Sequence, residues 1–311
     1  MRESPTTPYP TISIYASPQM LSTPLAERRK LITRIEQSGI EHVFVGDHIS
    51  FHNGFGMDGL VDAATLAAMS DSLSVMVGVY LLALRHPVAV ARQLSSLSRS
   101  APGRIVMGIG IGGEDRHEMA ISGVDAARRG KLTNHALAAV KGLLTGEPHS
   151  YQCEFFEYED AIIKPAPDPA IPFMVGGRSD AAIRRTALQG DGWLGLWCSP
   201  NRFGQVNQQV ADVAAESGRG HVAFEHGLQV WVGFGEKQQA RQHVARQMNE
   251  MYQMPFEPFE KYSPYGSPRE VADFLAPYVE QGCGRFNIAA CGESFEHEID
   301  GVAEVWSLLA R

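Results

Sequence analysis

The sequence lacks the features that mark nucleic-acid-binding and membrane proteins. It contains no basic run of the kind found on nucleic-acid-binding surfaces, and its 311 residues carry a net charge of −8. A nucleic-acid-binding surface needs clustered positive charge, so we expect no nucleic-acid partner. The longest apolar runs, such as Val75 to Leu84, are too short to span a bilayer. No membrane association is expected.

The chain also lacks the signs of a secreted or zinc-binding protein. Its four cysteines (Cys153, Cys198, Cys283 and Cys291) are scattered and form no C-x-x-C pair. This argues against a disulfide framework and a thiolate zinc site. The first ten residues, MRESPTTPYP, have no apolar stretch of the kind found in signal peptides. We therefore expect a cytoplasmic protein.

Short apolar runs alternate with amphipathic segments along the whole chain. The expected strands are Thr11–Ala16, His42–Val45, Leu73–Val79, Ile105–Ile111, Ile171–Val175, Gly192–Leu196, Gly227–Gly233 and Arg285–Ala289. The expected helices are Leu25–Gln37, Gly59–Ser70, Pro87–Ser98, Lys131–Leu144, Asp180–Leu188, Pro200–Glu216, Lys237–Tyr252 and Pro268–Gln281. Several strands are apolar on successive residues, which is typical of parallel strands buried on both faces.

The order and spacing of these segments favour one α/β fold, a (β/α)8 TIM barrel. The first four strands begin about 31 residues apart, the length of one βα unit. We expect a single domain over residues 1–311, with an open doubly wound sheet as the alternative. Two insertion segments break the spacing. Residues 146–164 predict an inserted hairpin, and residues 252–266 predict an ordered loop that could act as a lid over the barrel mouth.

Polar residues follow the second strand, at the end where such barrels place their active sites. Asp47 and His48 emerge there from a buried strand, and His48 is expected to hold or move a proton at a cofactor or substrate. The alternative is that Asp47 caps the loop and His48 packs at the rim. His48 and His52 are four residues apart, but the segment looks like a loop, so no metal site is expected.

The sequence after the fifth strand predicts an anion site. Gly176 and Gly177 precede Arg178, and Ser179 is suited to cap the following helix. Backbone N–H groups at a helix start bind anions, and an Arg adds a charge-assisted hydrogen bond. We interpret this turn as a phosphate site. The alternative is an ordinary strand-to-helix turn.

A G-x-G-x-x-G pattern occurs in the fourth strand, at Gly108, Gly110 and Gly113. In a dinucleotide-binding fold this pattern follows the first strand, and an acidic residue stands about twenty positions further on. Here the pattern lies in the fourth strand, and Thr133 stands at that position. The pattern therefore does not indicate a Rossmann fold. Glycines inside this strand are expected instead to leave room for a flat ring above the barrel.

Several further side chains near strand ends are weaker candidates. Glu114 and Glu118 are either acids at the mouth or solvated loop carboxylates. Arg85 either faces a phosphate or precedes a helix as part of its cap. Trp193 is expected in the core, and Trp197 could reach the rim.

Taken in order, these motifs resemble the luciferase-like monooxygenase superfamily over residues 11–311. That superfamily contains flavin-dependent monooxygenases and deazaflavin (coenzyme F420) dependent reductases and dehydrogenases. The resemblance rests on Gly46-Asp47-His48, VGVYLLALRHPVAVARQLSSLS with APGRIVMGIGIGGE, PFMVGGRSDAAIRRTALQGDGWL, and YGSPREVADFLAPYVEQG.

The resemblance implies a site for a flavin-type ring. A non-prolyl cis peptide would fall at Gly78-Val79 and support the ring. His48 would form a hydrogen bond near the reactive edge, with Asp47 orienting it. The residues implied as cofactor-binding are Gly78, Val79, Gly110, Gly112, Gly113, Glu114, Gly176, Gly177 and Arg178.

Both branches of the superfamily carry the Asp-His pair, so this pair does not distinguish FMN from deazaflavin. The choice between the two cofactors is made from the net charge of the chain. The acidic chain does not favour the long acidic tail of a deazaflavin. We therefore expect a monooxygenase that uses reduced FMN, supplied by a separate flavin reductase, on a small organic substrate. A homodimer is a further expectation. The alternatives are hydride transfer with coenzyme F420 and a non-enzymatic barrel subunit that has lost its cofactor.

Overall fold

The strand order is that of a (β/α)8 barrel in a computed structural model that describes residues 9–52 and 54–310. The eight strands are β1 (Thr11–Tyr15), β2 (His42–Val45), β5 (Ser74–Leu81), β6 (Ile105–Gly110), β9 (Phe173–Gly176), β10 (Gly192–Leu196), β11 (Gly227–Phe234) and β13 (Arg285–Cys291). Each is hydrogen-bonded to the next of these along the chain, and β13 is paired with β1. The predicted fold class is confirmed. Most of the first ten residues, where no signal peptide is expected, lie outside the described residues.

Each predicted helix is present, with its ends shifted by a few residues at most. They are α2 (Leu25–Gln37), α3 (Gly59–Ala67), α4 (Pro87–Ser100), α6 (Arg129–Leu143), α7 (Asp180–Gln189), α8 (Pro200–Glu216), α9 (Lys237–Tyr252) and α10 (Pro268–Glu280). Further elements are α1 (Pro18–Leu21), α5 (Arg116–Ile121), α11 (Phe295–Leu309), the 3-10 turns η1 (Leu82–Leu84) and η2 (Glu260–Tyr262), and β12 (Tyr265–Gly266). No helix within the described residues is both long and apolar enough to cross a membrane.

The chain divides into two compact units. Unit 1 comprises Met1–Val43, Leu194–Gln209 and Glu225–Arg311, and unit 2 comprises Phe44–Trp193 and Val210–Phe224. The single domain over residues 1–311 therefore stays a prediction.

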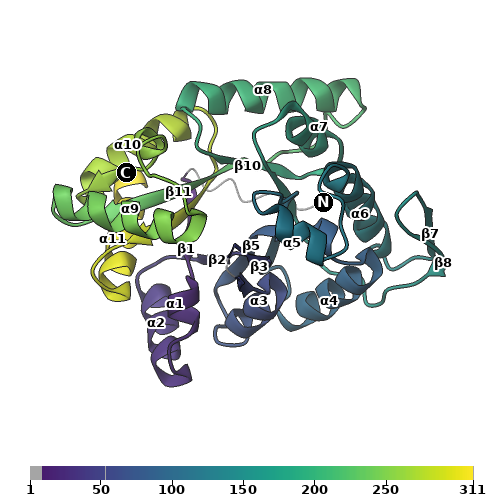
Figure 1. The fold of residues 1–311 in the computed structure, drawn as a ribbon, viewed down its shortest axis with the longest axis horizontal. Coiled ribbons are helices and arrows are strands. Elements are labelled where there is room, and N and C mark those ends of the chain that lie inside the picture. Colours follow the sequence, from purple (N-terminus) through teal and green to yellow (C-terminus); the bar gives the residue numbers. More distant parts are fainter. Residues whose placement is uncertain (1–8, 53, 311) are drawn as a thin grey trace. The chain divides into compact units, whose positions relative to one another are not determined.

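Unit 1 is built on three adjacent parallel strands, β1, β13 and β11. Ser13 lies opposite Asn287, which in turn lies opposite Gln229. On the other side of β11 lies β10, where Leu194 pairs with Gly227. Helix α11 follows β13 and packs on it and on α2 and α10 (Figure 1).

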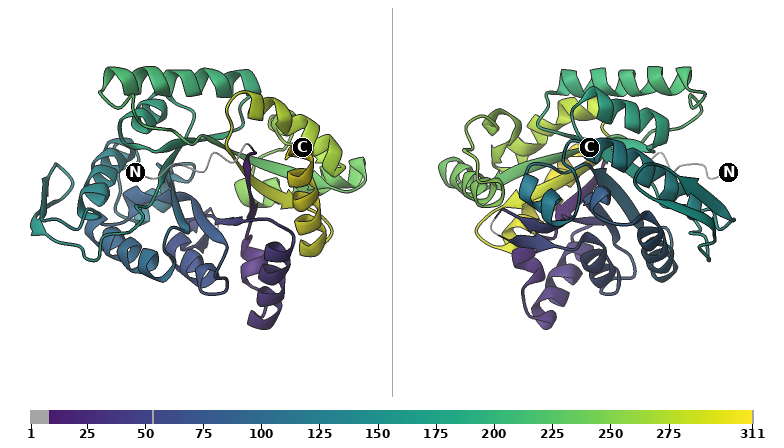
Figure 2. Two further views of the ribbon diagram at one scale, coloured as in Figure 1. Left: turned by 180° about the vertical axis from the view of Figure 1, so that it is seen from behind. Right: turned by 45° about the vertical axis from the view of Figure 1, so that its right-hand side comes forward.

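Unit 2 contains the parallel strands β5, β6 and β9 and two small antiparallel pairs. Strands β7 (His149–Gln152) and β8 (Glu157–Ala161) form a hairpin within residues 146–164, beyond α6 at the edge of the unit (Figure 2). Strands β3 (His48–Phe51) and β4 (Phe55–Met57) form the second pair. The expectation of a loop here is wrong, because Gly54 turns the chain with a φ of +90° and Phe51 is buried.

Candidate functional site

Strand β5 has an irregular backbone where the resemblance implies the cofactor ring. The peptide bond between Gly78 and Val79 is cis, which confirms that feature. The register between β5 and β6 shifts between Val77 and Tyr80. Val79 is half-buried.

Three glycines on the neighbouring strands make room for the side chain of Val79. A Cβ atom added at Gly110 would lie 2.4 Å from Val79 Cγ2. Added at Gly176 or Gly108 it would lie 3.0 or 3.2 Å from Val79 Cγ1. The sequence interpretation assigned the room left by the glycines inside β6 to a flat ring. The structure corrects this, because Val79 occupies that space.

Asp47 is buried and accepts four hydrogen bonds. One carboxylate oxygen accepts the N–H of Gly59 at 3.0 Å and Nη2 of Arg85 at 2.7 Å, and the other accepts the N–H of Leu81 at 2.9 Å and Nη1 of Arg85 at 2.6 Å. Burial raises the pKa of Asp47, while Arg85 and the two N–H groups act against that rise. Since four donors surround the carboxylate, we assign it the ionised form.

Asp47 therefore fixes the backbone at Gly59 and Leu81 and does not orient His48. The prediction that it does so is wrong, because its two carboxylate oxygens accept hydrogen bonds from Gly59, Leu81 and Arg85. Arg85 likewise serves neither of its expected roles. Its guanidinium forms a two-pronged ion pair with Asp47 and lies 4.5 Å from the centre of the Tyr80 ring.

Glu118 is the carboxylate that faces His48. Its side chain is 1% exposed, and Oε2 lies 3.1 Å from Nδ1 of His48. Oε1 accepts the N–H groups of Ile49 at 2.7 Å and Ser50 at 3.1 Å. Burial acts to raise the pKa of Glu118, but the hydrogen bond and charge of His48 and the two N–H groups lower it below its ordinary value of 4.5. Glu118 is therefore an ionised acceptor at neutral pH.

This contact determines what His48 can do. When Nδ1 donates to the carboxylate of Glu118, the neutral ring carries an unprotonated Nε2. The His48 side chain is 19% exposed and stacks on Phe51 with ring centres 4.0 Å apart. A histidine held in this way by a carboxylate can act as a general base through Nε2.

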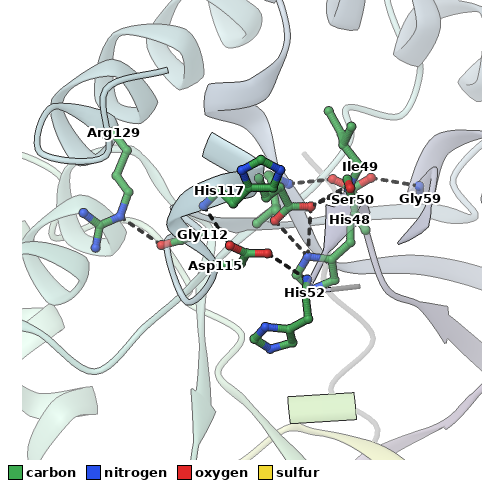
Figure 3. Close-up of polar contacts among 12 residues, drawn as sticks. His48, Ile49, Ser50, His52, Gly59, Gly112, Asp115, His117 and Arg129 are labelled. Atoms are coloured by element: carbon green, nitrogen blue, oxygen red, sulfur yellow. Dashed lines mark hydrogen bonds and ion pairs between the residues drawn. The ribbon is translucent and has the colours of Figure 1, made fainter. Parts of the chain in front are cut away.

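Asp115 joins the β3–β4 hairpin to the short helix α5. Its carboxylate accepts the N–H of His117, at the start of α5, and the N–H of His52, each at 2.7 Å (Figure 3). Helix α5 then places Glu118 one turn later. The signal for this helix is present in the sequence, as an Asp followed three residues later by a Glu.

The glycine segment after β6 is held by Arg129. Gly112 and Gly113 have φ values of +60° and +99°, which favour glycine. Nε of Arg129 donates to the carbonyl of Gly112 at 2.9 Å (Figure 3). Glu114 is exposed. The role of these residues in lining a cofactor channel stays a prediction.

The turn after β9 has the features of a phosphate site. Gly177 is exposed with a φ of +122°, and its carbonyl accepts Nε1 of Trp193 at 2.7 Å. Ser179 caps α7 by accepting the N–H of Ala182. Arg178 is exposed beside the helix start. Helix amides, a permissive glycine and a cation together fit an anion.

The predicted site residues lie in unit 2 and fall into separate groups. Gly110 and Gly176 lie against the side chain of Val79, which follows Gly78 in the chain, whereas His48 lies against Glu118. Trp193 is buried, as expected for a core residue. Among residues 9–52 and 54–310, no group of three or more His, Cys, Asp or Glu side chains is placed to hold a metal ion.

A comparison with protein families gives the wider relationship. Residues 11–281 match the family described as luciferase-like monooxygenase. The chain belongs to this family. A solved structure of an F420-dependent secondary alcohol dehydrogenase, in complex with an F420–acetone adduct, shares the fold of this luciferase-like protein. Its TM-score is 0.83 at 16% identity, over 97% of this chain and 99% of that chain.

Three curated relatives illustrate the range of the family. An uncharacterised protein of Mycobacterium tuberculosis is 34% identical over 158 residues, 50% of this chain and 54% of the relative. An F420-dependent glucose-6-phosphate dehydrogenase of Beutenbergia cavernae is 29% identical over 165 residues, 51% and 49% of the two chains. An FMNH2-dependent dimethylsulfone monooxygenase of Pseudomonas putida is 25% identical over 222 residues, 69% and 60% of the two chains. The chain spans about half the length of the first two.

Proposed function

We propose that this luciferase-like protein is a coenzyme F420-dependent oxidoreductase that transfers hydride between the deazaflavin and a small organic alcohol or carbonyl compound. The observation that carries the proposal is His48, held through Nδ1 by the buried carboxylate of Glu118. Oxidation of an alcohol carbon requires a base that takes the hydroxyl proton, and Nε2 of His48 suits this task.

The residues of unit 2 would divide the work as follows. When bound, the deazaflavin supplies a two-electron acceptor for hydride. The α7 amides and Arg178 would hold its phosphate, and Val79 would support its ring. Nε2 of His48 would take the proton, and Glu118 would keep Nδ1 protonated and stabilise the positive ring that results.

This proposal reverses the preference for FMN that net charge suggests. Net charge describes the whole surface, whereas the contact between His48 and Glu118 would belong to the proposed reacting centre. The similarity to an F420-dependent dehydrogenase supports the same cofactor. A homodimeric assembly and a cytoplasmic location stay predictions.

A second candidate is a monooxygenase that uses reduced FMN from a separate flavin reductase. The FMNH2-dependent monooxygenase matches 69% of this chain, a larger share than the other two relatives described above. The phosphate turn with Arg178 would also suit FMN, which carries one phosphate. This candidate requires oxygen, whereas hydride transfer with a deazaflavin does not.

Equilibrium titration with coenzyme F420 and with FMN, followed by fluorescence, separates the two candidates. We expect the deazaflavin to bind at least tenfold more tightly, a difference of about 1.4 kcal/mol. The loaded protein should then lose its oxidised deazaflavin absorbance with a suitable member of a panel of small alcohols in the absence of oxygen. Tighter binding of FMN, with oxygen uptake in the presence of a reductase, would favour the second candidate. Binding of neither cofactor would contradict both.

A further inference from the structure

The side chain of Glu298 joins three elements of unit 1 at the start of α11. Its Oε1 accepts the N–H of Gly292, which directly follows β13, at 2.9 Å. The side chain of Gln247 on α9 donates a second hydrogen bond to the same carboxyl group. Glu298 therefore fastens the first turn of α11 to the end of β13 and to α9.

Both donors to Glu298 are uncharged, which distinguishes this carboxyl group from Asp47 and Glu118. Within residues 9–52 and 54–310, it forms no ion pair with a Lys or Arg. A buried carboxylate without a cationic partner is costly, and burial raises the pKa of Glu298 to about 7, although the two hydrogen bonds act to lower it. The protonated and ionised forms are therefore both populated near neutral pH.

His297, the preceding residue, places an unpaired ring nitrogen beside this carboxyl group. Its Nδ1 is buried and has no hydrogen-bond partner among the residues that the structure describes. A Cβ atom added at Gly292 would lie 3.2 Å from that Nδ1 and 3.2 Å from Cγ of Glu298, so both side chains lie against the same glycine. A buried nitrogen without a partner is unfavourable. An unused partner thus lies next to a carboxyl group that needs one when it ionises.

Two further groups near Glu298 carry a charge or could carry one. Cys291 of β13 is fully buried, and burial together with the charge of Glu298 raises the pKa of its thiol, while Arg246 of α9 acts to lower it. Because the net effect is a rise, the thiol stays protonated near neutral pH. The guanidinium of Arg246 stays charged throughout this range. Neither group changes its charge near neutral pH, so neither masks the ionisation of Glu298.

We propose that Glu298 and His297 form a pH-dependent latch at the start of α11, in which the ionised carboxylate accepts a hydrogen bond from Nδ1–H of His297. A neutral imidazole can carry its proton on Nδ1, and such a donor suits a carboxylate. When Glu298 ionises, its proton leaves to solvent and its oxygens take up this further donor. The latch is closed in the ionised form and open in the protonated form. It uses no cofactor and does not depend on the proposed reaction.

Nuclear magnetic resonance of the 13C- and 15N-labelled protein without cofactor follows both groups. The side-chain carboxyl carbon of Glu298 should titrate with a midpoint of about pH 7, and Nδ1 of His297 should gain a protonated, hydrogen-bonded signal with the same midpoint. In Glu298→Gln, this step at His297 should be absent. Glu296→Gln, which changes an exposed carboxylate on the same turn, should leave both steps unchanged.

A second variant tests the hydrogen bond from the side of its donor. His297→Phe keeps a ring but removes Nδ1, so the midpoint of Glu298 should rise by about 1 pH unit. This variant also decides the matter if Glu298→Gln does not fold. A Glu298 midpoint near its ordinary value of 4.5, or an unchanged midpoint in His297→Phe, would overturn the proposal.

The stability of the fold gives an independent measure of the ionisation. Because the pKa of Glu298 in the folded protein lies above its ordinary 4.5, its protonated form stabilises the fold fully below about pH 4.5, and this contribution is lost as the pH rises through about 7. Urea denaturation should therefore show the wild type losing stability relative to Glu298→Gln over this range. A difference that stays constant from about pH 4.5 to pH 7 would also overturn the latch.

Discussion

The carboxylate of Glu118 lies 3.1 Å from Nδ1 of His48, although 70 residues separate the two in the chain. Asp115 caps the short helix that carries Glu118 and also binds the hairpin that begins with His48. Glu118 itself binds two backbone N–H groups of this hairpin. One buried carboxylate thus fixes both the ring of His48 and the backbone beside it.

Substitutions at this pair should affect turnover more than cofactor binding. His48→Asn removes the proton acceptor and should lower kcat by about 10²- to 10⁴-fold. Glu118→Gln retains the shape but loses the charge-assisted hydrogen bond, worth about 1.5–3 kcal/mol, so kcat should fall by about one to two orders of magnitude. Steady-state kinetics and cofactor titration of each variant give the comparison.

The control for these variants is His117→Asn, on the exposed side of α5. It should leave kcat within about twofold of the wild type, as expected for a solvated side chain. Wholesale loss of cofactor from His48→Asn would indicate that His48 packs at the rim and does not act on a proton.

The pH dependence of stability offers a second test of Glu118. Its pKa in the folded protein lies below the ordinary 4.5. The carboxylate therefore stabilises the fold fully above about pH 4.5, and this contribution is lost as the pH falls through the folded pKa. Glu118→Gln should be less stable than the wild type by about 1–3 kcal/mol at neutral pH. Urea denaturation should show the difference shrinking below about pH 4.5. A difference that stays constant down to about pH 3 would contradict this role.

The ion pair of Asp47 and Arg85 should contribute to stability far more than an exposed pair. Arg85→Met leaves Asp47 buried without its partner and should cost about 3–5 kcal/mol. Arg34→Met breaks a pair with Asp300 whose side chains are 44% and 58% exposed, so its cost should stay below about 1 kcal/mol. Denaturation by urea measures both.

A double variant tests whether the cost at Arg85 comes from the unpaired charge. Asp47→Asn combined with Arg85→Met should be more stable than the sum of the single changes predicts, because no buried charge remains. Equal costs for Arg85→Met and Arg34→Met would contradict the role of the buried pair.

The barrel could be predicted because each of its strands can be recognised from a short stretch of sequence. Runs such as VMVGVY and IVMGIGI are apolar on successive residues, and each is followed by a helical segment. Helix α11 is not among the eight predicted helices. Its sequence does show a helical pattern, because Ile299, Val302 and Val305 are buried at near-helical spacing. The β3–β4 hairpin could not be predicted in this way. Its strands of four and three residues are too short to show a period.

The pairing of charges in the site depends on the fold and not on neighbourhood in sequence. Asp47 stands next to His48 in the chain, but its partner is Arg85, 38 residues away. Glu114 and Glu118 both follow the fourth strand, and the sequence alone does not distinguish them. Glu118 is buried because it lies in α5, whereas Glu114, before this helix, is exposed. The strand ends could therefore be named as the candidate site from the sequence, while the contacts between its residues could not.

The phosphate site proposed for the turn after β9 predicts a change in cofactor affinity that is separate from stability. Arg178→Ala removes a charge-assisted hydrogen bond worth about 1.5–3 kcal/mol, so the Kd of the cofactor should rise by about one to two orders of magnitude. Arg184→Ala, an exposed arginine on the same helix, should leave the Kd nearly unchanged. Fluorescence titration measures both, and unfolding curves should match the wild type. Equal affinity in Arg178→Ala and wild type would contradict the phosphate site.

The protonation of the His48 ring tests most directly the claim that Glu118 makes it a base. Nuclear magnetic resonance of the 15N-labelled protein distinguishes a ring nitrogen that carries a proton from one that does not. In the neutral ring, we predict a proton on Nδ1, shared with Glu118, and none on Nε2. In Glu118→Gln, this preference should weaken. A neutral His48 ring that carries its proton on Nε2 in the wild type would contradict the account.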